Sequence, residues 1–252
     1  MKNIFVRTRT SEQLKAVLDW GRAAAVLADT GTWPQDSLSG YNGEVYICLP
    51  DVTRQSKIGS AEEMIQMARG RYGLVIKNLD QLEMVCEAGF TGPVIADSLL
   101  YACSSHAFLM YKEILPGLQF ISCDELTDQE MRKTGCDVIY KAYGHQQLMV
   151  TSQCLMKNYS GCRQGYVRFK NERGDIFYSQ TRCSQCYSVI YDGREISMLD
   201  RLDEITFKNI LADLTVENAA QTGTVLALLE LSGSGYKQDN RFTRGHHYRG
   251  VE

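Results

Sequence analysis

The chain has 252 residues, of which 44% are hydrophobic and 23% charged, so it is long enough to bury the core of one α/β domain. Its formal net charge of −3 excludes a global attraction to nucleic acid or an anionic membrane, so either partner has to be bound by a local patch. The first apolar run is interrupted by Arg7 and Arg9, and no segment approaches the roughly 18 apolar residues of a membrane span, so we expect a cytoplasmic protein.

From residue 1 to about 150, short apolar or β-branched runs alternate with longer amphipathic stretches, which is typical of βα units around a parallel sheet. Seven of the short runs are predicted strands: Ile4–Arg7, Ala24–Asp29, Val45–Leu49, Gly73–Lys77, Val94–Asp97, Gln119–Ser122 and Val138–Tyr143. Four stretches between them are predicted helices: Ser11–Trp20 with Ser11 as cap, Ser60–Arg69 with a capping box of Ser60 and Glu63, Asn78–Glu87 and Thr127–Lys133.

An eighth strand is predicted at Glu204–Leu211, followed by a helix over Thr215–Leu231. Eight βα units predict an α/β fold of the (β/α)8 type, a TIM-like barrel that fills residues 1–252 as a single domain. An open doubly wound sheet would show the same alternation. We favour the barrel because no glycine-rich dinucleotide fingerprint follows an early strand.

The pattern changes between the seventh and eighth strands. Residues 150–200 contain four cysteines and a predicted β-hairpin, with strands Gly165–Lys170 and Asp175–Ser179. This insertion follows the carboxyl end of a strand, on the face where barrel active sites gather.

Residues 232–252 form a polar and basic tail. Its cationic side chains, interleaved with Phe242 and Tyr248, are a candidate RNA-binding strip or simply a solvated terminus. They are Arg241, Arg244, His246, His247 and Arg249.

The four cysteines of the insertion are spaced as Cys154-x7-Cys162-x20-Cys183-x2-Cys186. The last two can hold one metal from a single turn, and the hairpin can return the first pair to meet them. Four sulfurs suit zinc or an iron–sulfur cluster, and the spacing does not separate the two. The alternative is a set of scattered free thiols. The other five cysteines occur singly and are expected to be packing residues: Cys48, Cys86, Cys103, Cys123 and Cys136.

The segment from Tyr143 to Cys154, YGHQQLMVTSQC, resembles the segment that marks the collagenase-like peptidase family, peptidase family U number thirty-two. Phe177–Leu199, with CSQC and REISML, resembles its second half-motif. Further similar positions extend over nearly the whole chain: Leu49, Pro50, Arg54, Ala96, Asp97, Ser98, Leu99, Ser122, Glu125, Leu126, Thr243, His246, Arg249.

The resemblance implies a barrel with a four-cysteine site, which in several relatives holds a [4Fe-4S] cluster. Those relatives carry out oxygen-independent hydroxylation of RNA bases or of a small aromatic quinone precursor, and some use prephenate as the oxygen source. This chain departs from the family at His145, where relatives commonly have Arg, and at Leu100 and Tyr101, where they commonly have Asn. It resembles the later portion of the longer members, so a partner barrel subunit is a second expectation beside an RNA substrate.

Polar residues at or just after the predicted strand ends are candidates for the substrate pocket, where a barrel directs them inward. They are Arg7, Arg54, Asp97, Ser98, Glu125, Lys141 and His145. We expect Asp97, Arg54, His145 and Glu125 to act in catalysis, with Asp97 and Arg54 the strongest candidates. Each is alternatively a rim ion pair or a solvated loop residue.

Two other functions remain open. A metal-dependent peptidase would need a nucleophile beside a base or an open metal site, yet neither a His-Glu-x-x-His nor a Gly-x-Ser-x-Gly motif is present. Cys154 or Cys183 with His145 as base is the remaining arrangement, and thiolates already bound to metal are poor nucleophiles. A non-catalytic scaffold subunit with a structural zinc or cluster is the third possibility.

Overall fold

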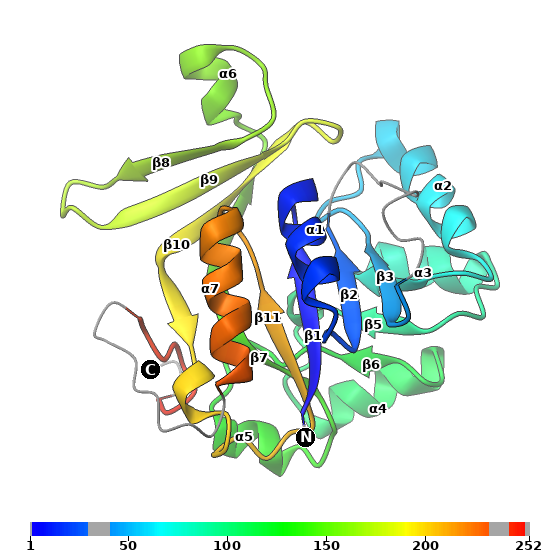
Figure 1. Ribbon diagram of the computed structural model, residues 1–252. Helices are drawn as coiled ribbons and strands as arrows, with labels where there is room; N and C mark the ends of the chain where they lie inside the picture. The colour runs from blue at the N-terminus through cyan, green and yellow to red at the C-terminus, as the bar shows by residue number, and fades with distance from the viewer. Residues whose placement is uncertain (1, 30–40, 232–241, 250–252) are drawn as a thin grey trace.

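The computed structural model describes residues 2–29, 41–231 and 242–249, without the side chains of Tyr159 and Ser160. These residues form a mixed α/β structure around one sheet of eleven strands (Figure 1). The strands are β1 (Asn3–Thr8), β2 (Ala25–Ala28), β3 (Glu44–Cys48), β4 (Gly73–Ile76), β5 (Val94–Ala96), β6 (Gln119–Phe120), β7 (Ile139–Thr151), β8 (Tyr166–Lys170), β9 (Ile176–Arg182), β10 (Tyr187–Ser197) and β11 (Asn209–Asp213).

The sheet order is β6-β5-β4-β3-β2-β1-β11-β7-β10-β9-β8. From β6 to β7 every neighbouring pair is parallel, whereas β7, β10, β9 and β8 pair antiparallel. The two ends of the parallel row also meet, because Ile121 after β6 forms a parallel bridge with Ile139 at the start of β7. The Ser122 amide donates to the Ile139 carbonyl at 3.0 Å.

Seven α-helices of the described residues follow or flank the strands: α1 (Ser11–Trp20), α2 (Ile58–Ala68), α3 (Leu79–Glu87), α4 (Ser105–Ile114), α5 (Asp128–Lys133), α6 (Leu155–Ser160) and α7 (Ala219–Glu230). Short 3-10 turns occupy Gln55–Lys57, Ser98–Leu100 and Leu199–Arg201. Helices α1 and α7 lie side by side, next to β1 and β11 (Figure 1).

Side chains alternate between two buried clusters, as the period of a strand requires. On β1, Val6 joins the large cluster that includes the helix residues Leu14 and Val225. Phe5 points to the other face, where a smaller cluster collects residues from every strand of the parallel row or its immediate extension. Its members are Phe5, Ala25, Leu27, Tyr46, Cys48, Val75, Ile95, Ile121, Ile139 and Leu211.

Strand β7 serves two parts of the sheet. Its first residues pair in parallel with β11, and its later residues continue antiparallel to β10 as far as Thr151. The pairing with β10 shifts register on both sides of Tyr191, so the ribbon bends away from the parallel row. The resulting insertion, α6 with β8, β9 and β10, stands at one end of the parallel strands (Figure 1).

The α/β class and the first six predicted strands are confirmed within two residues at each end, whereas the seventh continues to Thr151, eight residues beyond the predicted end at Tyr143. The hairpin of the insertion is confirmed too, with its second strand running three residues farther than predicted, to Arg182. The eighth strand lies at Asn209–Asp213 and not at Glu204–Leu211, because residues 204–208 form the approach to it. Two predicted caps are wrong. Thr10, not Ser11, caps α1, and α2 begins at Ile58 without a side-chain cap from Ser60.

Candidate functional site

A buried network of charged side chains lies where the parallel strands end, beneath the insertion. It combines four cations, Arg7, Arg9, Lys77 and Arg182, with four carboxylates, Asp29, Asp51, Asp97 and Asp213. All eight side chains are at most 10% exposed. Buried charges persist only when they are paired, and here the two signs balance.

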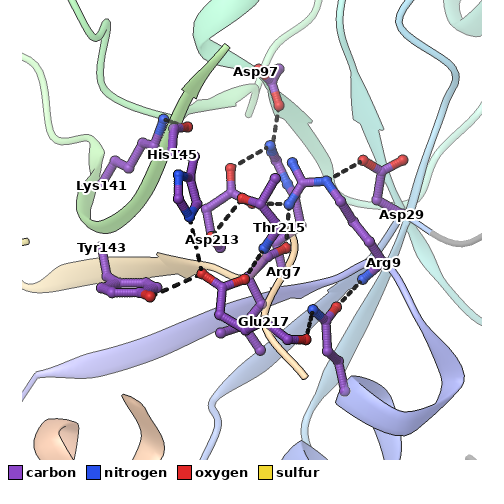
Figure 2. Close-up of polar contacts among 12 residues, drawn as sticks. Arg7, Arg9, Asp29, Asp97, Lys141, Tyr143, His145, Asp213, Thr215 and Glu217 are labelled. Atoms are coloured by element: carbon purple, nitrogen blue, oxygen red, sulfur yellow. Dashed lines mark hydrogen bonds and ion pairs between the residues drawn. The ribbon is translucent and has the colours of Figure 1, made fainter. Parts of the chain in front are cut away.

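Arg7 of β1 and Arg9, just beyond the end of that strand, lie at the centre of this network (Figure 2). Arg7 donates to Asp97 and, at 3.2 Å, to Asp213. Arg9 donates to the other oxygen of Asp213 and lies 3.4 Å from Asp29. Strand β1 lies between β2 and β11 in the sheet, and the guanidinium groups of Arg7 and Arg9 link carboxylates from the ends of β2, β5 and β11.

The insertion closes the other half of the network. Arg182, the last residue of β9, donates to Asp29 at 2.9 Å and lies 3.8 Å from Asp51. Lys77 bonds to both of these carboxylates at 3.3 Å. Tyr187 of β10 donates to Asp51 at 2.8 Å. The insertion is therefore held over the strand ends by ionic contacts and hydrogen bonds, not by apolar packing alone.

The network shifts the pKa of its members in opposite directions. Burial would raise the pKa of Asp213, but the charges of Arg9 and Arg7 outweigh burial and hold it below its usual range. The same balance, with Lys77 and Arg182 as the cations, lowers the pKa of Asp51. Burial alone would lower the pKa of Lys77, yet the neighbouring carboxylates raise it above its ordinary value. Asp213, Asp51 and Lys77 are therefore charged at neutral pH.

A second group of polar side chains surrounds His145, which is 2% exposed. Its Nδ1 lies 2.7 Å from the carbonyl oxygen of Asp192, so Nδ1 carries the proton of that bond. Nε2 faces Glu217 at 3.7 Å, and Glu217 accepts the Tyr143 hydroxyl at 2.9 Å. Lys141 donates to the His145 carbonyl at 3.3 Å and to Asp124 at 2.9 Å. This group has the residue types that move protons (Figure 2).

Helix caps place Arg9 and Glu217 beside each other. Thr10 and Gln13 form a capping box directly after Arg9. The Gln13 amide then accepts from the Arg9 backbone and donates to the Glu217 carbonyl at 2.9 Å. The buried Gln13 therefore fixes the loop after β1 against the loop after β11.

Two cavities flank the network under the insertion. The first, of about 180 Å³, is bounded by Asp29, Cys48, Arg182, Gln185 and Tyr187. The second, of about 240 Å³, is bounded by Arg9, Tyr166, Gln180, Thr215 and Glu217. In each, a buried glutamine oxygen has no hydrogen-bond partner among the described residues, Gln185 Oε1 and Gln180 Oε1 respectively. Such an acceptor is suited to a ligand donor or water.

The predicted catalytic residues do not all meet. Asp97, Arg7 and Lys141 lie in or beside the network, and His145 is close to Glu217. Ser98 donates to Asp97 at 3.3 Å. Glu125 is an exposed surface residue, and its neighbour Asp124 takes the inward position.

Arg54 lies at the start of the 3-10 turn after β3 and is half-buried. No hydrogen bond or ion pair of its guanidinium is formed with the described part of the chain. It is therefore a cation at the strand ends whose charge is available to a ligand.

Sequence reasoning missed Arg9, Asp29, Asp51, Lys77, Arg182, Asp213 and Glu217. For two of these residues the sequence pattern could have indicated a place in the site. Asp29 and Lys77 are the charged last residues of otherwise apolar predicted strands, the same position that selected Asp97. Arg182 had no such signal, because its role depends on the insertion folding back over the strands.

The four cysteines of the insertion occur as two separate pairs. Cys154 and Cys162 flank α6, and Cys183 and Cys186 form the turn from β9 to β10, where the Cys186 amide donates to the Cys183 carbonyl at 3.3 Å (Figure 1). None of them is in a disulfide. Within residues 2–29, 41–231 and 242–249, no group of three or more His, Cys, Asp or Glu side chains is arranged to hold a metal. Four thiols are ligands that suit zinc or an iron–sulfur cluster, so the four-cysteine centre stays a prediction.

Part of the basic tail is engaged within the chain. Arg244 pairs with Asp200, with the guanidinium Nη2 and Oδ2 2.8 Å apart. His247 lies 3.1 Å from Asp128. Arg241 lies outside the described residues, His246 is half-buried with its Nδ1 3.2 Å from the Arg249 carbonyl oxygen, and Arg249 is exposed.

No protein-family model and no curated protein matches this chain. Solved structures similar to it include one of SacUVDE, at 8% sequence identity and a TM-score of 0.34, over 91% of this chain and 98% of that one. A similarity this distant says nothing of the function. Among the described residues, no helix has the length and apolar character needed to cross a membrane.

Proposed function

We propose that this chain is an enzyme, or a subunit of one, that binds a small polar substrate at the carboxyl ends of its parallel strands. The observation that carries the proposal is the buried network of four cations and four carboxylates, which comes from several strand ends and is roofed by the insertion. Charged groups held rigidly beside a cavity are what a preorganised site requires.

The proposed architecture is a (β/α)8-type barrel with its site at the mouth. The bridge between Ile121 and Ile139 supports closure of the parallel row. The small buried cluster, drawn from all eight parallel strands, supports it as well, because inward side chains of a barrel fill its interior in layers.

The proposed reaction is oxygen-independent hydroxylation of an RNA base or a small aromatic precursor, the activity implied by the resemblance to the collagenase-like peptidases, in the cytoplasm as expected from the sequence. The cavities support a compact substrate, since about 180 and 240 Å³ is less than the roughly 300–1,000 Å³ of drug-sized ligand pockets. One flipped base or one aromatic ring is a suitable size.

Five side chains have roles in the proposed site. Arg54, whose guanidinium has no partner among the described residues, holds an anionic group of the substrate, and Arg7 is kept in position by Asp97 and Asp213. His145 and Glu217 hold or move a proton at Nε2 and Oε1, where 3.7 Å separates them. The insertion excludes water from this end of the strands through the contacts of Arg182.

A [4Fe-4S] cluster, or alternatively zinc, on Cys154, Cys162, Cys183 and Cys186 belongs to the same proposal. Because the described residues assemble no group of three or more His, Cys, Asp or Glu ligands, we derive no step of the reaction through a cluster. A scaffold subunit, in which the insertion is structural, is the alternative to this proposal. No observation favours the peptidase.

The proposal is tested by comparing modified nucleosides of total RNA, and hydroxylated aromatic metabolites, in cells with and without the gene. Loss of one product, restored by the wild-type chain and by Asp80→Asn but not by Asp97→Asn, is the expected result. Asp80 is an exposed carboxylate on α3 and serves as the matched control. If no nucleoside and no aromatic product disappears, the hydroxylation proposal is wrong.

A further inference from the structure

Two cysteines that are far apart in the sequence bring their sulfurs together at the strand ends. The Sγ atoms of Cys103 and Cys123 are 2.9 Å apart. Cys103 lies after the 3-10 turn that follows β5, and Cys123 lies just after β6. Since β5 and β6 are parallel neighbours, the segments leaving them emerge side by side. Cys123 is 5% exposed, whereas Cys103 is reachable from solvent.

This distance is short enough for a covalent bond to form with little rearrangement. Both thiols are free in the structure. A disulfide has an S–S distance of about 2.05 Å, so closing the pair needs a movement of roughly 1 Å. No other two cysteines of the described residues are joined by a thiol contact.

We propose that Cys103 and Cys123 form a redox-active dithiol that a peroxide oxidises to a disulfide. The Cys103 sulfur attacks one peroxide oxygen, the O–O bond breaks, and the leaving hydroxide takes up a proton to give water. The Cys123 sulfur then attacks the Cys103 sulfenic acid, the S–O bond breaks, and a second water leaves. The two thiols lose two electrons and two protons, and the peroxide is reduced to two waters.

The disulfide is placed where it can affect the candidate site. Cys123 stands between Ser122, whose hydroxyl accepts the Lys141 amide at 3.0 Å, and Asp124, which pairs with the Lys141 side chain. Cys103 ends the loop that begins at Asp97. Oxidation ties these two loops together and restricts the carboxylates at the ends of β5 and β6.

A metal site on the same pair has less support. Two thiols need further ligands to hold zinc, and no third His, Cys, Asp or Glu completes a metal-binding group there in the described chain. A cytosolic disulfide of this kind is more often a sensor than a structural bond.

The reduced pair is stable at neutral pH. Burial, the hydrogen bond with Cys123 and the charge of Glu125 raise the pKa of Cys103 to about 12. The reactive thiolate is therefore scarce, and the oxidation rate should rise about tenfold for each pH unit between 7 and 9. An ordinary cysteine, with a pKa of about 8.5, would approach its plateau over the same range.

The test treats the native full chain with hydrogen peroxide, blocks remaining thiols, and maps tryptic peptides by mass spectrometry. Cleavage places Cys123 alone in peptide 113–132, and Cys103 with Cys86 in peptide 78–112. The expected product is the 78–112 peptide joined to 113–132, lighter by two hydrogen atoms than their sum and separated by reductant. A Cys86→Ser chain removes the ambiguity and serves as the matched control, since Cys86 is exposed on α3.

The Cys86→Ser chain should form the cross-link as fast as wild type, and Cys103→Ser should not form it. The melting temperature of the oxidised wild-type chain should rise by several degrees, a shift absent from Cys103→Ser. Peptide 113–132 that stays fully alkylated in the oxidised native chain, or a cross-link that appears only after unfolding in urea, overturns the proposal. Because the wild-type map decides this, the result stands even if a serine variant folds poorly.

Discussion

Arg182 and Asp29 lie 153 residues apart in the chain, yet the Arg182 Nη2 is 2.9 Å from the Asp29 Oδ2. The contact joins the last residue of β9, in the insertion, to the residue after β2. With side-chain exposures of 10% and 7%, both groups are shielded from water. The insertion is therefore attached to the parallel strands through a buried charge pair. Removing either partner would leave the other charge buried and unpaired, which destabilises the fold.

The first prediction concerns this pair. Arg182→Gln should lower the free energy of unfolding by about 3–5 kcal/mol, because it leaves Asp29 and Asp51 with too few cations in a buried setting. Urea denaturation measures the change. Arg194→Gln is the control, since Arg194 is 71% exposed and its pair with Asp192 contributes at most about 1 kcal/mol. Equal losses in the two variants would contradict the role given to Arg182.

Acid should unfold the protein through the same network. The folded chain holds the pKa of Asp213 and Asp51 below the unfolded value of 3.8, so these carboxylates stabilise the fold at every pH above that value. Below it the unfolded chain binds protons first, and the stabilisation is lost as pH falls toward the folded pKa. The melting temperature should stay level from about pH 7 to about pH 5 and drop steeply below about pH 4.

The Asp213→Asn chain is the comparison for the acid prediction. It should melt lower at neutral pH, because Arg7 and Arg9 lose a charged partner. It should then lose less stability between pH 5 and pH 3, because it lacks one carboxylate whose pKa is lowered by folding. An unchanged acid slope would show that other groups control acid unfolding.

Gly144 sets the distance between β7 and β11. Its φ is +149°, and an added Cβ would lie 2.9 Å from both the Cβ and the carbonyl oxygen of Asp213. Gly144→Ala should therefore lower the free energy of unfolding by roughly 2–4 kcal/mol. Gly223→Ala, in α7 with open space around the glycine, should instead raise it by up to about 1 kcal/mol. Chemical denaturation of both variants tests the pair, and a harmless Gly144→Ala would contradict the close approach.

Substitution of Arg54 should affect substrate binding without affecting the stability of the fold. Because its guanidinium has no partner within the described residues, Arg54→Ala should change the free energy of unfolding by no more than about 0.5 kcal/mol. The loss of a charge that binds substrate should weaken substrate binding by about tenfold or more. Product levels in complemented cells and urea denaturation of the same variant give the two readouts. Full activity would remove Arg54 from the proposed site.

The proposed four-cysteine centre makes a prediction of its own. Cys183→Ser should lose bound metal and become less soluble, because one of four ligands is removed. Cys48→Ala should keep its metal, since Cys48 is a buried residue of β3. Iron, sulfide and zinc measured per chain after anaerobic purification test both. Equal iron and sulfide support a cluster, one zinc per chain supports the alternative, and full metal content in Cys183→Ser would exclude this ligand set.

Much of the fold could be predicted because strand and helix patterns are local. The apolar runs at Val45–Leu49 and Gly73–Lys77 indicate buried parallel strands by composition alone. The same logic placed Asp97 at a strand end. It could not predict β10, because Tyr187–Ser197 mixes polar and apolar residues in an irregular register. The role of β7 in two parts of the sheet was equally beyond a local pattern.

The sequence by itself determined the α/β class, the seven early strands and the hairpin, since each depends on neighbouring residues. Only the tertiary structure decided which charges meet. Asp213 became a partner of Arg7, 206 residues away, because β11 lies beside β1 in the sheet. Cys103 and Cys123 were predicted to be single packing residues, and the parallel pairing of β5 with β6 brought their sulfurs into contact. Strand order is a property of the whole chain, so the partners it selects cannot be inferred from local spacing.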